Sequence, residues 1–156
     1  MSATTNGFWR AYPFIRVFTA LALISIGSSA MYFAIIGLKP VGDEFGVTRG
    51  LASMPYAATM LGFGIGGIAM GYMSDRFGVM PVTLAGGLML ALGFNLAGQA
   101  DSIYSYAFYH SVFLAFFGCA TMFAPLVADI SHWFDRRRGI AVGIVISGSY
   151  VAGTIW

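Results

Sequence analysis

Side chains that could carry out acid–base or ligand chemistry are rare in this sequence. Only 9% of its 156 residues are charged. Within the apolar segments, His110 is the only side chain ionisable near neutral pH that lies far from an end, whereas Arg16 and Asp129 lie near edges that water can reach. An imidazole in a low-dielectric cavity can bond a carboxylate or carry a proton, and it can equally bond a carbonyl of a packed neighbour. Both interpretations of His110 stay open.

No constellation of catalytic residues accompanies His110. The second histidine, His132, lies far along the chain, and no acid–base or metal-binding motif surrounds either residue. The one cysteine, Cys119, sits in an apolar run, where a small packing role is expected and no intrachain disulfide can form. We therefore expect no enzyme, no metal site and no cofactor.

The elements that must position these residues are five long apolar segments. They span residues 17–38, 51–73, 82–100, 103–130 and 140–156, and charges fall almost wholly between them. A bilayer core needs about 20 apolar residues per helix and leaves backbone groups no solvent to bond, so each segment must be a helix. With 58% hydrophobic residues, the chain is predicted to be an all-α, multi-pass integral membrane protein with one domain over residues 1–156. Its partner is the lipid bilayer, and its small, scattered charge excludes nucleic acid.

The basic residues indicate how the chain crosses the membrane. Six lie on one side of the predicted topology and two on the other: Arg10, Arg16, Arg76, Arg136, Arg137 and Arg138 against Lys39 and Arg49. This excess predicts a cytoplasmic N-terminus. The fifth segment then runs outward and the chain stops at Trp156 without a polar tail, so it is predicted to be truncated.

Small residues recur at four-residue intervals in two of the segments. The repeats are Gly62 and Gly66, Gly67 and Gly71, and Gly139, Gly143 and Ser147. Such ridges let helices approach closely in lipid. We expect them to be packing faces.

The stretch 71–78 resembles the loop between the second and third helices of the major facilitator superfamily. The matching residues are Gly71, Asp75, Arg76 and Gly78, while the two basic residues that follow in the family are missing here. The resemblance implies a conformational-switch loop. In it, Asp75 would pair with a cation on a neighbouring helix end, such as Arg137 or Arg138, and the two glycines would let the helices turn within a short loop.

A second stretch resembles the signature between the fourth and fifth helices of monocarboxylate carriers and oxalate/formate antiporters. It matches at Trp133, Phe134, Arg137, Arg138, Gly143 and Gly148. The Asp-Gly-Gly-Trp stretch of the animal carriers is not found in the first segment, which favours the bacterial antiporter-like branch. Together the resemblances cover all five segments.

These resemblances imply a fold and a function. The fold would be the incomplete N-terminal six-helix half of a major facilitator transporter, in a bacterial inner membrane. Its function would be secondary active transport of a small organic anion, monocarboxylate- or dicarboxylate-like, by alternating access. A coupled proton and the missing C-terminal half would be further partners. Because helices one, four and five line the cavity in this family, the resemblance makes Tyr32, His110 and Tyr150 candidates for the substrate path.

Two other functions remain open. A drug or metabolite exporter of the same superfamily is compatible with the first motif alone. A truncated membrane fragment that does not transport is compatible with the abrupt end at Trp156.

Overall fold

The computed structural model describes residues 5–134 and 138–156, with side chains from Pro13 onward. These residues form helices and no strand. The first crossing consists of α1 (Thr5–Gly27), α2 (Ser29–Ile36) and α3 (Leu38–Glu44); the second consists of α4 (Arg49–Ala52) and α5 (Met54–Phe77). The third is α6 (Val79–Ala97), the fourth joins α7 (Ile103–Tyr109), the π-helical η1 (His110–Cys119) and α8 (Ala120–Trp133), and the fifth is α9 (Arg138–Ile155).

Five of these helical stretches are long and apolar enough to cross a membrane, which confirms the predicted fold class. They are Pro13–Ile36, Arg49–Phe77, Val79–Ala97, Ile103–Trp133 and Arg138–Ile155, with mean hydropathy from 1.3 to 2.0. The predicted segments differ from these stretches only at their ends, by at most four residues, and at several ends a partly polar turn continues the helix. α5, for example, runs through Ser74, Asp75 and Arg76 before it stops.

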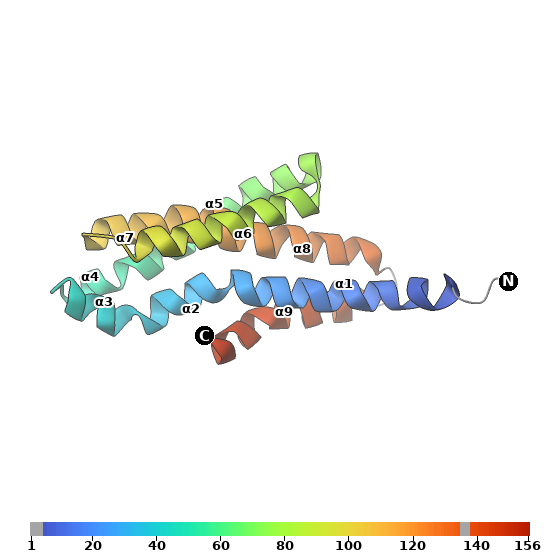
Figure 1. The fold of residues 1–156 in the computed structure, drawn as a ribbon, viewed down its shortest axis with the longest axis horizontal. Helices are drawn as coiled ribbons and strands as arrows, with labels where there is room; N and C mark the ends of the chain where they lie inside the picture. Colours follow the sequence, from blue (N-terminus) through green and yellow to red (C-terminus); the bar gives the residue numbers. More distant parts are fainter. Residues whose placement is uncertain (1–4, 135–137) are drawn as a thin grey trace.

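The helices run lengthwise beside one another, with the turns grouped at two ends (Figure 1). We call the end where α1 begins, α5 turns into α6 and α8 stops the N-terminal end; α3 and α4 lie at the opposite end (Figure 1). The grouping of basic residues expected from the sequence holds for those with described side chains. Arg16, Arg76 and Arg138 belong to the N-terminal end, and Lys39 and Arg49 to the opposite one.

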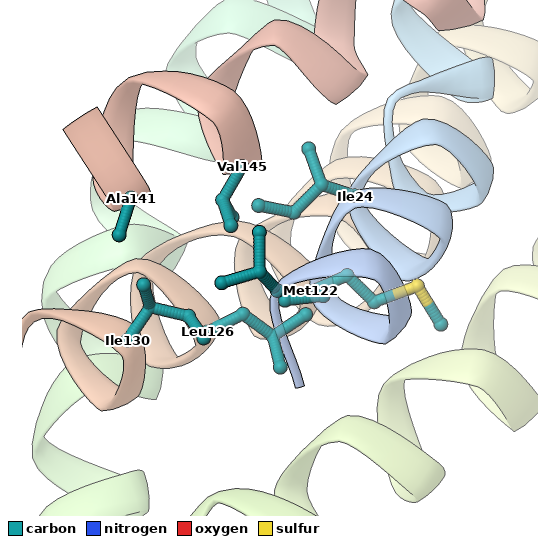
Figure 2. Close-up of a cluster of buried hydrophobic side chains, with 8 residues drawn as sticks. Ile24, Met122, Leu126, Ile130, Ala141 and Val145 are labelled. Carbon is teal, nitrogen blue, oxygen red and sulfur yellow. The ribbon is translucent and has the colours of Figure 1, made fainter. Parts of the chain in front are cut away.

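The fourth crossing lies at the centre of the bundle. η1 and α8 pack against α1, α5, α6 and α9. One buried cluster, drawn in Figure 2, gathers side chains of α1, α8 and α9: Val17, Ala20, Ile24, Met122, Leu126, Ile130, Ala141 and Val145. Lipid tails are as apolar as these side chains, so close packing rather than escape from water holds such helices together.

Glycines make the closest approach possible between α5 and η1. A Cβ atom added at Gly62 would collide with the carbonyl oxygen of Ser111, and one at Gly66 would lie 2.7 Å from the carbonyl oxygen of Phe116. Both contacts are to backbone, which cannot move aside as a flexible side chain can. The expected packing role of this pair is confirmed.

The other glycine ridges are not covered by the described residues. A Cβ added at Gly64, Gly67 or Gly71 on α5, or at Gly139 or Gly143 on α9, would have nothing within 4 Å. Their expected packing role is therefore not fulfilled within this part of the chain. α5 and α9 each carry one packed small-residue face and one open one.

Candidate functional site

The turn between α5 and α6 is tighter than the sequence predicted. Residues 71–77, expected to be a loop, belong to α5, and Gly78 is the single residue between the two helices. Gly78 has φ +89°, a conformation that strongly favours glycine, and its N–H donates to the carbonyl oxygen of Ser74 at 2.8 Å. Gly71 lies within the helix, and a Cβ atom added there would have nothing within 4 Å. The prediction that Gly71 enables the turn is therefore wrong.

The charged pair of this motif faces outward at the N-terminal end. Asp75 and Arg76 are both exposed. Arg76 lies over the Phe77 ring, with its Cζ atom 5.5 Å from the ring centroid. Among the described residues Asp75 has no ion pair, and Arg138, one of its two expected partners, is an exposed residue at the start of α9. The other expected partner, Arg137, lies outside the described residues.

The second motif ends α8 and begins α9. Phe134 follows α8 with extended backbone angles and packs on the core cluster between α1, α8 and α9. Gly143 lies on the open face of α9. Gly148 lies on the buried face, where an added Cβ would be 2.6 Å from the carbonyl oxygen of Leu21. Gly148 thus allows α1 and α9 to pack closely, whereas Gly143 lies on a face of α9 that the described residues do not cover.

A short polar seam runs along the same contact between the first and fifth crossings. The Ser25 hydroxyl donates to the carbonyl oxygen of Gly148 at 2.8 Å, and the Ser28 hydroxyl bonds that of Ser149 at 3.2 Å. Sequence reasoning did not single out these serines. Their hydroxyls fix the register of α9 against the end of α1, next to the candidate Tyr150.

The two candidate tyrosines lie on the two crossings that form this contact. The Tyr32 ring packs on Gly153, where an added Cβ would lie 2.5 Å from its Cε1 atom. Tyr150 is 74% exposed and lies three residues before Gly153 on α9. The structure therefore places the two phenols on neighbouring helices, with Tyr150 open to the surroundings of the bundle.

His110 lies elsewhere, inside the bundle. It is 1% exposed, its ring centroid is 4.5 Å from that of Tyr106, and its Nδ1 atom has no hydrogen-bond partner among the described residues. It is also the first residue of η1, a π-helical stretch that sequence reasoning did not predict; such stretches are frequent at functional sites. No hydrogen bond or ring contact among the described residues joins His110 to Tyr32 or Tyr150.

The structure brings together two charged residues that sequence reasoning treated separately. At the N-terminal end, Nη1 of Arg16 donates to both carboxylate oxygens of Asp129, at 3.1 and 2.9 Å. The Cζ atom of Arg16 lies 4.2 Å from the ring centroid of Trp133. The signal available in the sequence was the charge pattern: Arg16 directly precedes the first apolar segment and Asp129 lies at the end of the fourth, on the same predicted side of the membrane.

The opposite end carries a cavity of about 350 Å³ beside α3 and α4. Its lining includes Lys39, Asp43 and Arg49. The exposed carboxylates of Glu44 and Asp101 lie at the same end and offset these two cations. In the described part of the chain, no group of three His, Cys, Asp or Glu side chains could hold a metal ion.

Five membrane-crossing helices, glycine-mediated contacts and a one-residue turn between the second and third crossings define a multi-pass helical membrane protein. A profile of the Major Facilitator Superfamily matches residues 18–155. The chain therefore belongs to this superfamily, whose members carry small molecules across lipid bilayers.

Similar proteins are transporters of more than one kind. The chain is 35% identical over 132 residues to the fujikurins efflux protein of Gibberella fujikuroi, covering 85% of this chain and 27% of that protein. It is 27% identical over 144 residues to the MFS-type transporter pytF of Aspergillus terreus, covering 86% of this chain and 48% of that protein. It is 36% identical over 77 residues to human monocarboxylate transporter 11, covering 49% of this chain and 16% of that protein. In each case the matched part is less than half of the relative's length.

Proposed function

We propose that this chain supplies the N-terminal half-bundle of a secondary transporter that moves a small organic anion by alternating access. The observation that carries this proposal is the pair of open small-residue faces on α5 and α9 in a chain of this superfamily. Gly64, Gly67 and Gly71 form one face, and Gly139 and Gly143 the other. In lipid such faces allow another helix to approach closely and to slide, as two halves of a transporter must when they rock.

The motif between α8 and α9 and the similarity to monocarboxylate transporters support an anionic substrate. The motif resembles the monocarboxylate and oxalate/formate signature, and the human relative is named as a monocarboxylate transporter. In this proposal His110, Tyr32 and Tyr150 line the substrate path, and a proton is the coupling ion.

An exporter of a metabolite or drug is the second candidate. It is favoured by the 35% identity to the fujikurins efflux protein, which extends over 85% of this chain. A fragment that does not transport by itself is a third possibility.

Transport measurements separate these candidates. The protein encoded by the whole gene would be reconstituted in liposomes and tested for counterflow of labelled lactate, formate and oxalate. The proposal expects saturable uptake that unlabelled carboxylates compete away. Extrusion of a bulky apolar compound without carboxylate uptake would support the exporter instead, and absence of both would support the fragment.

The orientation of the bundle gives the first specific prediction. In a Cys119→Ala background, a single cysteine replacing Asp43 is expected to react with a membrane-impermeant maleimide added to intact cells. One replacing Arg138 should react only after permeabilisation, because the two exposed residues lie at opposite ends of the bundle and the basic end is expected to be cytoplasmic. Labelling of both from outside would contradict this topology.

A second prediction concerns the exposed carboxylate at the α5–α6 turn. We expect Asp75→Asn to slow transport by the complete protein up to about fivefold, because an exposed ion pair contributes at most about 1 kcal/mol. Its partner would be a cation that approaches when the N-terminal end closes. Asp101→Asn, an exposed carboxylate beyond α6 at the opposite end, is the control and should leave the rate unchanged. Equal transport rates for wild type and Asp75→Asn, at equal abundance in the membrane, would mean that the Asp75 charge has no role in the conformational change.

A further inference from the structure

The cluster of Arg16, Asp129 and Trp133 joins the first and fourth crossings at the N-terminal end. Nη1 of Arg16 bonds both oxygens of Asp129, and the guanidinium lies over the Trp133 ring. The Arg16 side chain is 32% exposed and that of Asp129 is 25% exposed. The pair is therefore partly shielded, and part of each side chain remains accessible at this end of the bundle.

The arrangement is already a carboxylate-binding site, occupied by a carboxylate of the chain itself. A guanidinium binds carboxylates well because its donors are planar and permanently charged. The Trp133 ring adds an attractive face for the cation and restricts where it can lie. An organic anion passing along the first and fourth crossings would present the same chemical group that Asp129 presents.

We propose that Arg16 is an anion-binding residue of this half-bundle and that Asp129 is an internal competitor for it. When a small carboxylate reaches the N-terminal end, it displaces the Asp129 carboxylate from the Arg16 guanidinium. When that anion leaves, Asp129 bonds Arg16 again. This inference rests on the proposed function in assuming that the cargo is an organic anion. It adds the location of a binding step.

The competing explanation is that the pair only clamps α1 to α8. The two explanations predict different effects of removing the Asp129 carboxylate: loss of stability if the pair is a clamp, and tighter anion binding if Asp129 is a competitor. Removing one partner of a structural, partly buried ion pair destabilises the protein, and removing both restores part of the loss. If Asp129 is instead an internal competitor, removing it strengthens binding of the external carboxylate. Removing Arg16 as well then abolishes that binding.

Trp133 provides a probe inside the site. In a chain carrying Trp9→Phe and Trp156→Phe, Trp133 is the only tryptophan left. This chain would be reconstituted in lipid nanodiscs and titrated with sodium acetate, with sodium chloride at equal ionic strength as the reference. We expect acetate, but not chloride, to change the Trp133 emission in a saturable way, because movement of the guanidinium alters the ring's surroundings.

Two substitutions in this background test the competition. Asp129→Asn is expected to lower the half-saturating acetate concentration about tenfold, since hydrogen bonds to charged groups typically change affinity by that factor or more. Arg16→Gln is expected to abolish the saturable response. Arg16→Lys keeps the charge without the planar fork and should weaken the response several-fold, which provides a milder variant if Arg16→Gln does not fold.

The control is Arg76→Gln, which removes another cation at the same end, one that lies over Phe77 rather than Trp133. It should leave the titration unchanged. A response shared by chloride, an unchanged or raised half-saturation in folded Asp129→Asn, or a response that survives in Arg16→Gln would each overturn the inference. The titration needs no transport, so a positive titration with no carboxylate counterflow would contradict the proposed function and leave the site standing. Carboxylate counterflow without a saturable Trp133 response would contradict the site at Arg16 and leave the proposed function standing.

Discussion

Replacing Gly148 by leucine is expected to destabilise the half-bundle by about 3 kcal/mol, at the upper end of the usual cost of overfilling a packed contact. Gly148 faces α1 so closely that even a Cβ atom would lie 2.6 Å from the carbonyl oxygen of Leu21 and 3.2 Å from the hydroxyl of Ser25. The first of these is backbone, so α9 must shift as a whole. That shift also removes the hydrogen bond from Ser25 to the carbonyl oxygen of Gly148.

The same helix supplies the matched control. Gly143 is also a helical glycine of α9, but a Cβ there would have nothing within 4 Å. Gly143→Leu should therefore leave the thermal midpoint of the chain in detergent within a few degrees of wild type, while Gly148→Leu lowers it clearly. In the complete transporter Gly143→Leu should still reduce transport, because the proposed second half needs the open face. Equal midpoints for the two variants would mean that the α1–α9 contact is looser than described.

The second large effect is expected at His110. In the complete transporter, His110→Ala should raise the apparent KM for a carboxylate about tenfold or more, the usual effect of one lost hydrogen bond to a charged group. The motivation is a buried imidazole whose Nδ1 atom has no partner in the described part of the chain, at the start of a π-helical stretch in the central crossing. A buried polar atom without a partner costs free energy, and a bound substrate that bonds the ring would supply the missing partner.

The substitution series distinguishes the roles of this histidine. His110→Gln keeps a donor and should raise KM less than alanine does. If His110 carries the coupled proton, both variants should lose uphill transport while anion exchange survives. If the ring only packs on Tyr106, 4.5 Å away, both variants should lower protein abundance and leave the KM of the remaining protein unchanged. That result would contradict the substrate-path role and turn attention to Tyr32 and Tyr150.

The sequence by itself determined the number and type of the crossings. Hydrocarbon cannot hydrogen-bond the backbone, so each apolar segment of sufficient length had to be a helix. The positions of charged residues between the segments determined which of them share an end of the bundle. The motif at residues 71–78 placed the turn near Gly78, although it did not show that α5 continues to Phe77, because a polar helical turn and a polar loop have similar compositions.

Only the tertiary structure decided which small and charged residues meet. Gly148 is packed and Gly143 open because they lie on different faces of α9 and only one face meets α1. Arg16 and Asp129, 113 residues apart in the chain, pair because α1 and α8 come together at the same end. The π-helical stretch His110–Cys119 was also visible only in the structure, because the sequence of an apolar helical segment does not distinguish it from an α-helix. Contacts between distant segments leave no periodic trace in a single sequence. His110 could be singled out from its type and position, whereas Tyr32 and Tyr150 depended on the resemblance, and the substrate-path role of all three stays a prediction.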